Sequence, residues 1–570
     1  MNAIAPLVPV MPDSAPFSEE QRAYLNGFLA GLFSWTPANA APAQPAVPAT
    51  TLTVLYGSQT GGAEKAAKKL AKLAGQRGFK ATIRDMGETK PVDIAAAGNL
   101  LVIASTYGDG EPPDRARDFW AALSNGAPRM EKTRFSVLAL GDSSYTKFCE
   151  FGRQLDARFA ELGAQRVVPR RDCDVEWTEH FEDWIAEAFS ALGTATPVAP
   201  ASEEEEAPAF DRDSPCPSPF TVNRLLSGAS SAKDVRHFEF SLEGTGLTYA
   251  CGDALGVWPE NDPAMVQEIL DLIKLDGATL VTGRKKQQVT LREALLRHFE
   301  ITRIPQSLLL EVTAGRAVET ISASWCEGRD IVDLLRLVPD LKWEAPAFTA
   351  LLRSLSPRLY SISSSPAAHS GSVHLTVSAV RYESHGRQRH GLCSTFLADR
   401  LPAGDPARIF VHENNNFRPP AGDVPLIMIG PGTGIAPFRG FLHDRAATGA
   451  KGRNWLFFGD QHASSDYLYQ EEIEGFHASG LLTRLDLAWS RDSSEKVYVQ
   501  HLMLAAADEI WAWLNEGACI CVCGDATRMA RDVDTALHRI IETAGGKTPD
   551  EAAAWVKRLQ SERRYQRDVY

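Results

Sequence analysis

The sequence predicts a multidomain α/β protein in which a doubly wound parallel domain is followed by a β-barrel and then by a second parallel α/β domain. The chain has 570 residues, enough for several domains of roughly 100–200 residues each. Apolar strands alternate with amphipathic helices towards both ends of the chain, which is typical of parallel sheets covered by helices. Between these regions, apolar residues recur at every second position, which is typical of antiparallel strands.

The composition disfavours several other classes of protein. Hydrophobic residues make up 44% and charged residues 23% of the chain, as in ordinary globular proteins. Its 59 Lys and Arg against 72 Asp and Glu give a net charge of −13, which disfavours nucleic acid as a partner. We expect no membrane anchor and no secretory signal, because no long apolar run is present. Nine cysteines without a framework spacing indicate reduced thiols and a cytoplasmic location.

Residues 1–49 are rich in Pro and Ala and predict a flexible arm. Within the arm, Ser18 and Gln21 have the spacing of a capping box, and apolar residues then recur at helical intervals as far as Phe33. We therefore expect a short amphipathic helix over residues 18–35. Either it docks on its own domain or it forms homo-oligomers, and the pattern favours neither.

Residues 50–193 are expected to form the first folded domain. A helix with one apolar face ends near Gly78, and the last helix is striped with apolar side chains from Trp177 to Ala188. Buried strands are predicted at three places, namely 51–57, 99–105 and 135–141. This alternation predicts a doubly wound parallel sheet.

A linker separates this domain from the rest of the chain. Residues 194–215 contain Pro, Ala and a run of four Glu, which predicts a solvated segment. Residues 216–420 are expected to form the barrel, interrupted by a helical insertion over about 262–352. Residues 421–570 return to alternating strands and helices and are expected to form the last domain.

Three loops of the first domain indicate a site for a phosphate and a flat aromatic ring. SQTGGA precedes a helix, whose N–H groups and dipole suit a phosphate. STYGDGEPPD and LGDSSYTKFC each bring a tyrosine that can wall an isoalloxazine ring at the carboxyl ends of the strands. The alternative is that both tyrosines only pack loops. The candidate residues are Ser58, Gln59, Thr60, Gly61, Gly62, Ala63, Ser105, Thr106, Tyr107, Gly108, Leu140, Gly141, Asp142, Ser143, Ser144, Tyr145, Thr146, Lys147, Phe148 and Cys149.

These loops resemble the FMN-binding loops of diflavin reductases, and the remaining chain resembles the same family in the same order. The resemblance implies a flavodoxin-like FMN domain, then a ferredoxin-reductase-like FAD barrel with a helical connecting insertion, then an NADP-binding domain. The tract RLYS resembles the family's FAD signature, in which Arg358 would bind the pyrophosphate and Tyr360 would lie against the ring. An ordinary barrel strand is the alternative. The implied FAD contacts are Thr302, Arg358, Leu359, Tyr360, Ser361, Thr376, Val377, Ser378, Tyr382, Gly391, Leu392, Cys393, Ser394 and Tyr570.

Two further tracts resemble the family's NADP site. GPGTGIAPFRG follows a strand and opens a helix, which is the context of a dinucleotide loop. SRDSSEKVYVQ offers two cations and three hydrogen-bonding groups, which suit the 2′-phosphate of NADP. A solvated charged loop is the alternative. The implied NADP contacts are Gly432, Thr433, Gly434, Ser490, Arg491, Lys496, Val497, Tyr498, Val499, Gln500 and Asp532.

The resemblance also implies a catalytic group around the hydride path, made of Ser361, Cys523 and Asp568. Tyr570 would cover the FAD ring until nicotinamide displaces it, unless the end of the chain is frayed. The cysteines of CICVC have the spacing of a strand and lack the gap of zinc sites. We expect no metal site in this chain.

Within the family, NNNFRPP, NWLFFGDQH and RRYQRDVY resemble tracts of the flavoprotein (alpha) component of NADPH-sulfite reductase. The implied activity is a relay from NADPH through FAD and FMN to the hemoprotein (beta) subunit, which reduces sulfite to sulfide. Tyr107 departs from this branch and has a form typical of cytochrome reductases. A soluble cytochrome-reductase-like donor to another haem or metal acceptor therefore stays open, as does a non-catalytic scaffold or binding subunit. Seven acids between Asp172 and Glu187 predict either a docking face or a solvated helix face.

Overall fold

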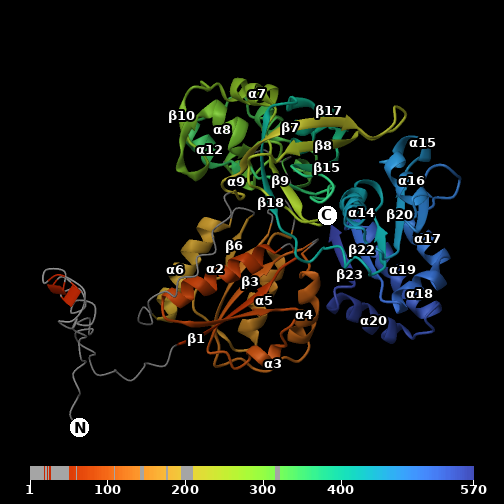
Figure 1. Cartoon of the computed structure of the whole chain (residues 1–570). Helices are drawn as coiled ribbons and strands as arrows, with labels where there is room; N and C mark the ends of the chain where they lie inside the picture. Colours follow the sequence, from red (N-terminus) through yellow and green to blue (C-terminus); the bar gives the residue numbers. More distant parts are fainter. Residues whose placement is uncertain are drawn as a thin grey trace, which may run out of the picture.

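Three folded parts meet around the C terminus of the chain (Figure 1). This computed structural model describes residues 18, 22–23, 25–26, 50–59, 61–107, 110–141, 147–174, 177–193, 210–314, 321 and 323–570. The parts follow the predicted order of a doubly wound domain, a barrel with a helical insertion and a parallel α/β domain, which confirms the predicted fold class. None of the described helices is both long and apolar enough to cross a bilayer.

Most of the predicted arm and linker lies outside the described residues. Within the arm, the N–H of Arg22 donates to the carbonyl of Ser18 at 2.9 Å, as in a helical turn. The remainder of the predicted helix over 18–35, and residues 194–209 of the linker, are not described. Both expectations therefore stay predictions.

The first sheet is entirely parallel, with the strand order β2-β1-β3-β4-β5 and with β6 also paired to β4. The three predicted strands coincide with β1, β3 and β4. The sequence pattern missed β2, an edge strand with mostly exposed side chains and therefore no apolar run. The strands are β1 (Thr51–Gly57), β2 (Lys80–Asp85), β3 (Asn99–Ser105), β4 (Arg134–Leu140), β5 (Gln165–Arg166) and β6 (Arg171–Cys173). The helices are α2 (Gly62–Gln76), α3 (Pro91–Ile94), α4 (Arg117–Ser124), α5 (Glu150–Glu161) and α6 (Thr178–Leu192), with a 3₁₀ turn, η1, at Asp114–Ala116.

The barrel is an antiparallel sheet with the strand order β14-β9-β18-β7-β8-β15. A bridge between Ile362 and Leu375 joins its first and last strands and closes the ring. The strands are β7 (Cys216–Leu225), β8 (Val235–Ser241), β9 (Ala254–Trp258), β14 (Arg358–Ser361), β15 (Ser372–Ser378) and β18 (Pro406–His412). A hairpin, a short helix and a π-helical turn follow β15, namely β16 (Arg381–Ser384), β17 (Arg387–His390), α13 (Leu392–Thr395) and η3 (Phe396–Arg400).

The predicted insertion between β9 and β14 is mostly helical and has its own apolar core, which includes Leu270, Leu295 and Phe348. Its elements are α7 (Pro263–Ile273), β10 (Leu280–Thr282), η2 (Arg284–Lys286), β11 (Gln288–Thr290), α8 (Leu291–Arg297), β12 (Phe299–Glu300), α9 (Gln306–Thr313), α10 (Ala323–Cys326), α11 (Ile331–Arg336), α12 (Ala345–Ala350) and β13 (Arg353–Ser354).

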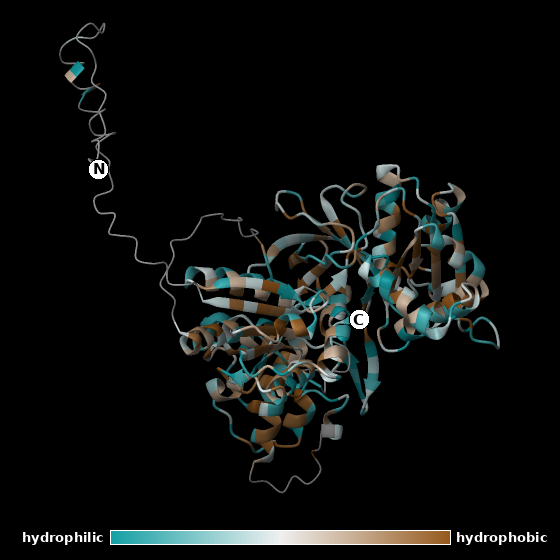
Figure 2. Cartoon of the chain, turned by 90° about the horizontal axis from the view of Figure 1, so that it is seen from below, coloured by the Kyte–Doolittle hydropathy of each residue, from teal (hydrophilic) through white to brown (hydrophobic). Residues whose placement is uncertain are grey.

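The last domain is a second parallel sheet, with the strand order β21-β20-β19-β22-β23. Apolar residues predominate in its strands (Figure 2) and on the helix faces that pack against the strands. The strands are β19 (Leu426–Ile429), β20 (Asn454–Asp460), β21 (Arg484–Trp489), β22 (Cys519–Gly524) and β23 (Tyr565–Val569). The helices are η4 (Gly432–Gly434), α14 (Ile435–Thr448), α15 (Ala463–Asp466), α16 (Gln470–Ala478), α17 (Val499–Ala505), α18 (Ala507–Asn515), α19 (Met529–Thr543) and α20 (Pro549–Ser561).

The end of the chain is ordered, so the alternative of a frayed terminus is wrong. Residues 565–569 form β23, which pairs with β22 so that Cys523 lies beside Asp568. Beyond the strand, the N–H of Tyr570 donates to the carbonyl of Gly524 at 3.1 Å, and its own carbonyl accepts from Ala526 at 3.0 Å. This strand was not recognised in the sequence because its charged residues leave no apolar run.

A buried polar group joins the barrel to the last domain. The hydroxyl of Tyr469 lies 2.9 Å from His237 Nδ1 and 2.7 Å from the hydroxyl of Thr376, both on barrel strands. Arg439 of α14 donates to the carbonyl of Ser363 at 2.9 Å. Because every partner is shielded from water, these hydrogen bonds fix the two parts relative to one another.

His237, Glu239 and His374 of this group are arranged closely enough to ligate a metal ion, which the sequence did not lead us to expect. Their hydrogen bonds oppose this use. Arg439 Nη1 lies 3.3 Å from His374 Nδ1, and an arginine can only donate, so the ring hydrogen sits on Nε2, which faces Ser372 at 2.9 Å. The nearby guanidinium also repels a cation.

The packing of α5 on β4 gives a first prediction. A Cβ added to Gly152 would lie 2.2 Å from the Cβ of Ala139, whereas Gly75 in α2 has nothing within 4 Å. Gly152→Ala should therefore destabilise the first domain by about 1–3 kcal/mol through overpacking. Gly75→Ala should be neutral or stabilise by up to about 1 kcal/mol through helix propensity. Urea denaturation followed by near-UV circular dichroism measures both; equal stabilities would contradict the packing argument.

The buried histidines give a second prediction. Burial lowers the pKa of His237 and His369 to about 4 and that of His374 to about 2. These rings are neutral in the fold but bind protons in the unfolded chain below about pH 6.5. Stability is therefore greatest above pH 6.5 and falls as the pH is lowered towards 4. Calorimetry of His374→Gln should show a weaker loss over this range, whereas His385→Gln, at an exposed ring, should follow the wild type.

Candidate flavin and nicotinamide sites

The first loop of the doubly wound domain has the geometry of a phosphate cradle. Gly61 caps α2 with a φ of 86°, a left-handed conformation that favours glycine. Ser58 is buried, and its hydroxyl has no hydrogen-bond partner within the described part of the chain. An orphaned hydroxyl beside free helix N–H groups fits the phosphate of a nucleotide. Thr60 lies outside the described residues.

Hydrogen bonds join the described residues of the two tyrosine loops. The hydroxyl of Thr106 accepts from the N–H of Phe151 at 3.2 Å, and the N–H of Thr106 donates to Leu140 at 2.8 Å. Burial raises the pKa of the Cys149 thiol to about 12, so this thiol stays protonated and structural. Several predicted contacts lie outside the described residues, namely Gly108, Asp142, Ser143, Ser144, Tyr145 and Thr146.

A cavity of about 840 Å³ lies between the barrel and the insertion, and five predicted FAD contacts line it: Thr302, Arg358, Tyr382, Gly391 and Leu392. Glu300 ties two of them together. It accepts from the hydroxyl of Thr302 at 2.5 Å and pairs with the guanidinium of Arg358 at 3.2 Å. Gly391 precedes α13, whose first N–H groups have no intrahelical acceptor. The size and the cationic lining fit a dinucleotide such as FAD.

The sequence missed most of the cationic lining of this cavity. Arg387 and Arg389 form ion pairs with Asp330, which caps α11, and with Asp333 inside that helix. The RQRH tract just before GLCS was the sequence feature that could have indicated this cationic lining. Further guanidinium groups also line the cavity, those of Arg303, Arg329, Arg353 and Arg400.

Other predicted FAD contacts have side chains that are occupied elsewhere. Thr376 bonds to Tyr469 in the buried polar group, and Val377 lies in the apolar core of the barrel. The hydroxyl of Ser394 accepts from the N–H of Val380 at 3.1 Å. Cys393 is buried beside Tyr360. A contact of these residues with FAD would have to use the backbone.

The dinucleotide loop of the last domain is closely packed under its helix. A Cβ on Gly434 would lie 2.2 Å from the carbonyl of Cys523, so only glycine fits at this position. Arg491 and Lys496 are exposed and form no ion pair with any described residue. Gln500 donates to Asp532 at 3.1 Å. Ser490 is fixed by donating to the Asp460 carbonyl, whereas Val499 belongs to the core.

The three predicted catalytic residues lie together, although they come from β14, β22 and β23. Ser361 donates to Asp568 Oδ2 at 2.7 Å, and Cys523 Sγ lies 3.9 Å from the same oxygen. Burial raises the pKa of Asp568, and these two hydrogen bonds offset part of the rise. Burial also raises the pKa of the Cys523 thiol. The sequence missed Asn414, which donates to the other oxygen of Asp568 at 3.4 Å.

Tyr570 lies between this group and the dinucleotide loop. Its hydroxyl is 2.9 Å from that of Thr433, and 63% of the residue is exposed. The side chain is therefore accessible at the edge of the site.

The first domain contacts the last domain through β23. Arg567 pairs with Asp114 at 2.5 Å, and both side chains are largely buried. Asp114 in turn accepts from the side chain of Gln59 in the phosphate loop at 3.3 Å. The hydroxyl of Tyr107 donates to the carbonyl of Val569 at 3.1 Å. The predicted FMN loops of the first domain thus face the candidate hydride site of the last one.

Comparisons with known proteins agree with this architecture. Three family models match the chain in order: "Flavodoxin" at residues 54–186, "FAD binding domain" at 208–323 and 316–396, and "Oxidoreductase NAD-binding domain" at 428–535.

Curated relatives match nearly the whole chain. The "Sulfite reductase [NADPH] flavoprotein alpha-component" of Bacillus subtilis (strain 168) is 43% identical over 581 residues, covering 97% of this chain and 96% of the relative. The proteins of the same name from Escherichia coli O9:H4 (strain HS) and Cronobacter sakazakii (strain ATCC BAA-894) are each 42% identical. Their alignments cover 96% and 100% of this chain, and 95% and 99% of the relatives.

The fold and the three sites thus define an NADPH-dependent diflavin oxidoreductase, with FMN, FAD and NADPH as its cofactors. The chain belongs to the family of NADPH-sulfite reductase flavoprotein alpha-components.

The contact through β23 gives a third prediction. Arg567→Ala removes a charge-assisted hydrogen bond worth about 1.5–3 kcal/mol. The Asp114 carboxylate then keeps its ion pair with Arg117 at 3.2 Å and its hydrogen bond from Gln59, and both of these partners belong to the first domain. The first domain should then separate more often from the rest, and small-angle X-ray scattering should record a larger radius of gyration. Arg531→Ala is the matched control, because its pair with Glu111 is exposed and 3.5 Å long. Identical scattering from both variants would contradict the assignment.

Proposed function

We propose that this chain supplies electrons from NADPH to a separate hemoprotein that reduces sulfite to sulfide. The names of the relatives carry the choice of acceptor. The group of Ser361, Cys523 and Asp568 supports a working hydride site. When bound, NADPH supplies a hydride, FAD accepts the electron pair, and FMN passes electrons singly to the acceptor.

In this proposal, the chain's own residues bind and orient the cofactors. Arg491 and Lys496 attract the 2′-phosphate that distinguishes NADPH from NADH. The η4 turn, which contains Gly434, lets the dinucleotide approach the backbone. Asp568 orients the Ser361 hydroxyl and the Cys523 thiol towards the hydride path and places negative charge where the nicotinamide becomes cationic.

The first domain has to leave its observed position to meet an acceptor. Tyr107 of its flavin loop bonds to Val569, so this face is covered by the last domain. We propose that breaking the Asp114–Arg567 pair frees the domain, and that residues 194–215 act as the tether. The helix over 18–35 is proposed to join copies of the chain. A cytoplasmic location is proposed because all nine cysteines are free.

The structure supports a docking face at the acidic run from Asp172 to Glu187 less strongly than the sequence alone does. The described structure pairs four of its acids with cations of the same chain, Asp172 with Arg170, Asp174 with Arg353, Glu182 with Lys69 and Glu187 with Arg171. Glu176 and the side chain of Glu179 lie outside the description. The pairing favours a solvated, largely neutralised helix face over an open acidic patch.

Specific observations bear on the two alternative functions. Tyr107 stands in a STYG loop of the cytochrome-reductase form, which favours a soluble donor to another haem or metal acceptor. The hydrogen bond from Ser361 to Asp568 is present, as a working hydride site would require, and this disfavours a non-catalytic scaffold or binding subunit.

The acceptor assay is our fourth prediction. Protein loaded with FMN and FAD and mixed with a sirohaem-containing sulfite reductase hemoprotein should produce sulfide from sulfite at the expense of NADPH. A haem-thiolate monooxygenase should be reduced far more slowly by the same preparation. Reversed preferences would establish the cytochrome-reductase alternative, and a preparation that NADPH cannot bleach would establish the scaffold.

Tyr570 provides a fifth prediction. If its ring covers FAD, deleting Tyr570 should raise flavin fluorescence and weaken the preference for NADPH over NADH by about tenfold or more. Tyr570→Phe is the matched control, because it keeps the ring and removes only the hydroxyl that faces Thr433. Unchanged fluorescence and preference after the deletion would refute ring cover.

A further inference from the structure

The Asp568 carboxylate is held differently at its two oxygens. Ser361 and Cys523 both approach Oδ2, at 2.7 Å and 3.9 Å. Oδ1 faces Asn414, whose amide nitrogen lies 3.4 Å away. No other described side chain donates to Oδ1. Without Asn414, described side chains would hold the carboxylate through Oδ2 alone.

The amide of Asn414 can face Asp568 in only one way. Asn414 Oδ1 accepts from the N–H of Asn416 at 3.3 Å, so the nitrogen of the amide must be the atom that points to the carboxylate. The reverse orientation would set an oxygen against an oxygen and leave the N–H of Asn416 without this acceptor. The amide is therefore an oriented donor.

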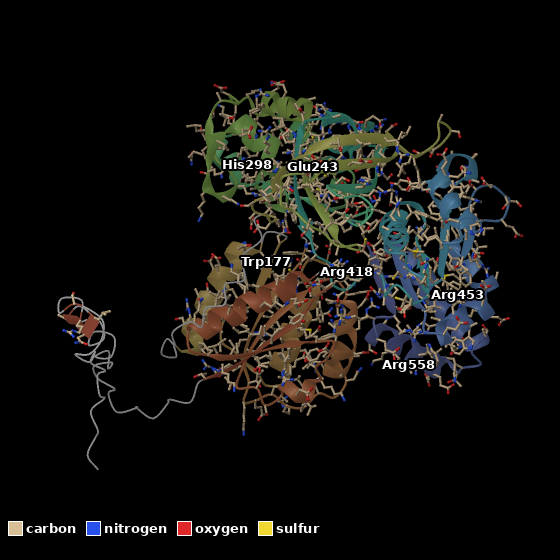
Figure 3. All side chains as sticks on the ribbon, viewed as in Figure 1. Trp177, Glu243, His298, Arg418, Arg453 and Arg558 are labelled. Atoms are coloured by element: carbon tan, nitrogen blue, oxygen red, sulfur yellow. The ribbon has the colours of Figure 1, made fainter. Side chains whose placement is uncertain are left out.

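The backbone of Asn414 is anchored as firmly as its side chain. Its N–H donates to Asp253 Oδ1 at 2.9 Å, and its carbonyl accepts from Phe417 at 3.2 Å. Asp253 is 2% exposed and pairs with Arg418 at 2.5 Å. Arg418 lies at the junction of the three parts (Figure 3), and its backbone N–H donates to Gln566 Oε1 at 2.7 Å.

We propose that Asn414 is a positioning residue of the hydride site: its amide locks Asp568 so that Oδ2 faces Ser361 and Cys523. The inference rests on the proposed function, because it assigns a role within the same site. It specifies which loop orders the site, since residues 414–418 connect the barrel, through Asp253, to β23, through Gln566 and Asp568.

The pH dependence of this site can be assigned to Asp568. The titratable groups that face it are Cys523 on β22, Tyr570 at the chain end and Tyr107 from the first domain. Burial raises the pKa of Tyr107 to about 12 and also raises that of Cys523. Loss of water around its hydroxyl raises the pKa of Tyr570, although the residue as a whole is exposed. All three groups therefore stay neutral below pH 9. Arg567, the neighbouring charge on β23, is paired with Asp114. Removing a donor from a carboxylate raises its pKa.

The test compares Asn414→Ala with Asn415→Ala, a neighbouring and exposed asparagine in the same loop. With full-length protein, stopped-flow reduction of FAD by NADPH should slow about three- to tenfold at pH 7 for Asn414→Ala. Its acid limb should move to higher pH by about 0.5–1 unit. The dissociation constant of NADP⁺ should change less than twofold. Asn415→Ala should match the wild type throughout.

A second readout does not depend on turnover. The infrared band of the protonated Asp568 carboxyl, identified by its loss in Asp568→Asn, should persist to higher pH in Asn414→Ala than in the wild type. Asn414→Asp, which sets a second carboxylate beside the first, should shift the band further in the same direction. Asn414→Asp replaces Asn414→Ala in this test if the alanine variant does not fold.

The possible outcomes separate the two proposals. An unshifted band and an unshifted acid limb in the Asn414 variants would overturn the role of Asn414 and leave the proposed function standing. A wild type that NADPH fails to reduce would overturn the proposed function, while the infrared titration would still decide whether Asn414 holds Asp568.

Discussion

Strand β23 is the constraint on which the assembled structure depends. It is the edge strand of the last sheet, and its pairing with β22 fixes Asp568 beside Cys523. Successive side chains of a strand point to opposite faces, so Arg567 is directed to Asp114 of the first domain while Asp568 is directed to Ser361 of the barrel. Five residues thus bring together three domains that are far apart in sequence.

This arrangement connects the predicted phosphate loop of the first domain to the candidate hydride site by direct contacts. Gln59 in the phosphate loop bonds to Asp114, Asp114 pairs with Arg567, and Arg567 precedes Asp568. In this position Tyr107 of the predicted FMN loop bonds to Val569, so the face that we propose for an outside acceptor is covered. A small number of polar contacts suits the proposed separation of the first domain, because such an interface would have to form and break in each cycle.

The sequence predicted those parts of the fold that rest on local patterns. Buried strands such as β1 and β3 carry continuous apolar runs, and the glycine loops sit between a strand and a helix, so both are visible without coordinates. Strands β2 and β23 were missed as sheet elements because their side chains are mostly polar, and their pairing depends on neighbours distant in sequence. The same reason applies to the site: motifs located Ser361, Cys523 and Asp568, but Asn414 and the arginines opposite α11 became evident only when the chain was folded.

The burial of the thiols has a practical consequence. Eight of the nine cysteines are buried, including the three of β22, and only Cys326 is partly accessible. Cys326 lines the large cavity between the barrel and the insertion. A thiol-reactive fluorophore or spin label would therefore attach to one position without mutagenesis, and dinucleotide in the cavity would shield that position from the reagent. The natural sequence thus carries its own single-site handle for following the loading of this cavity.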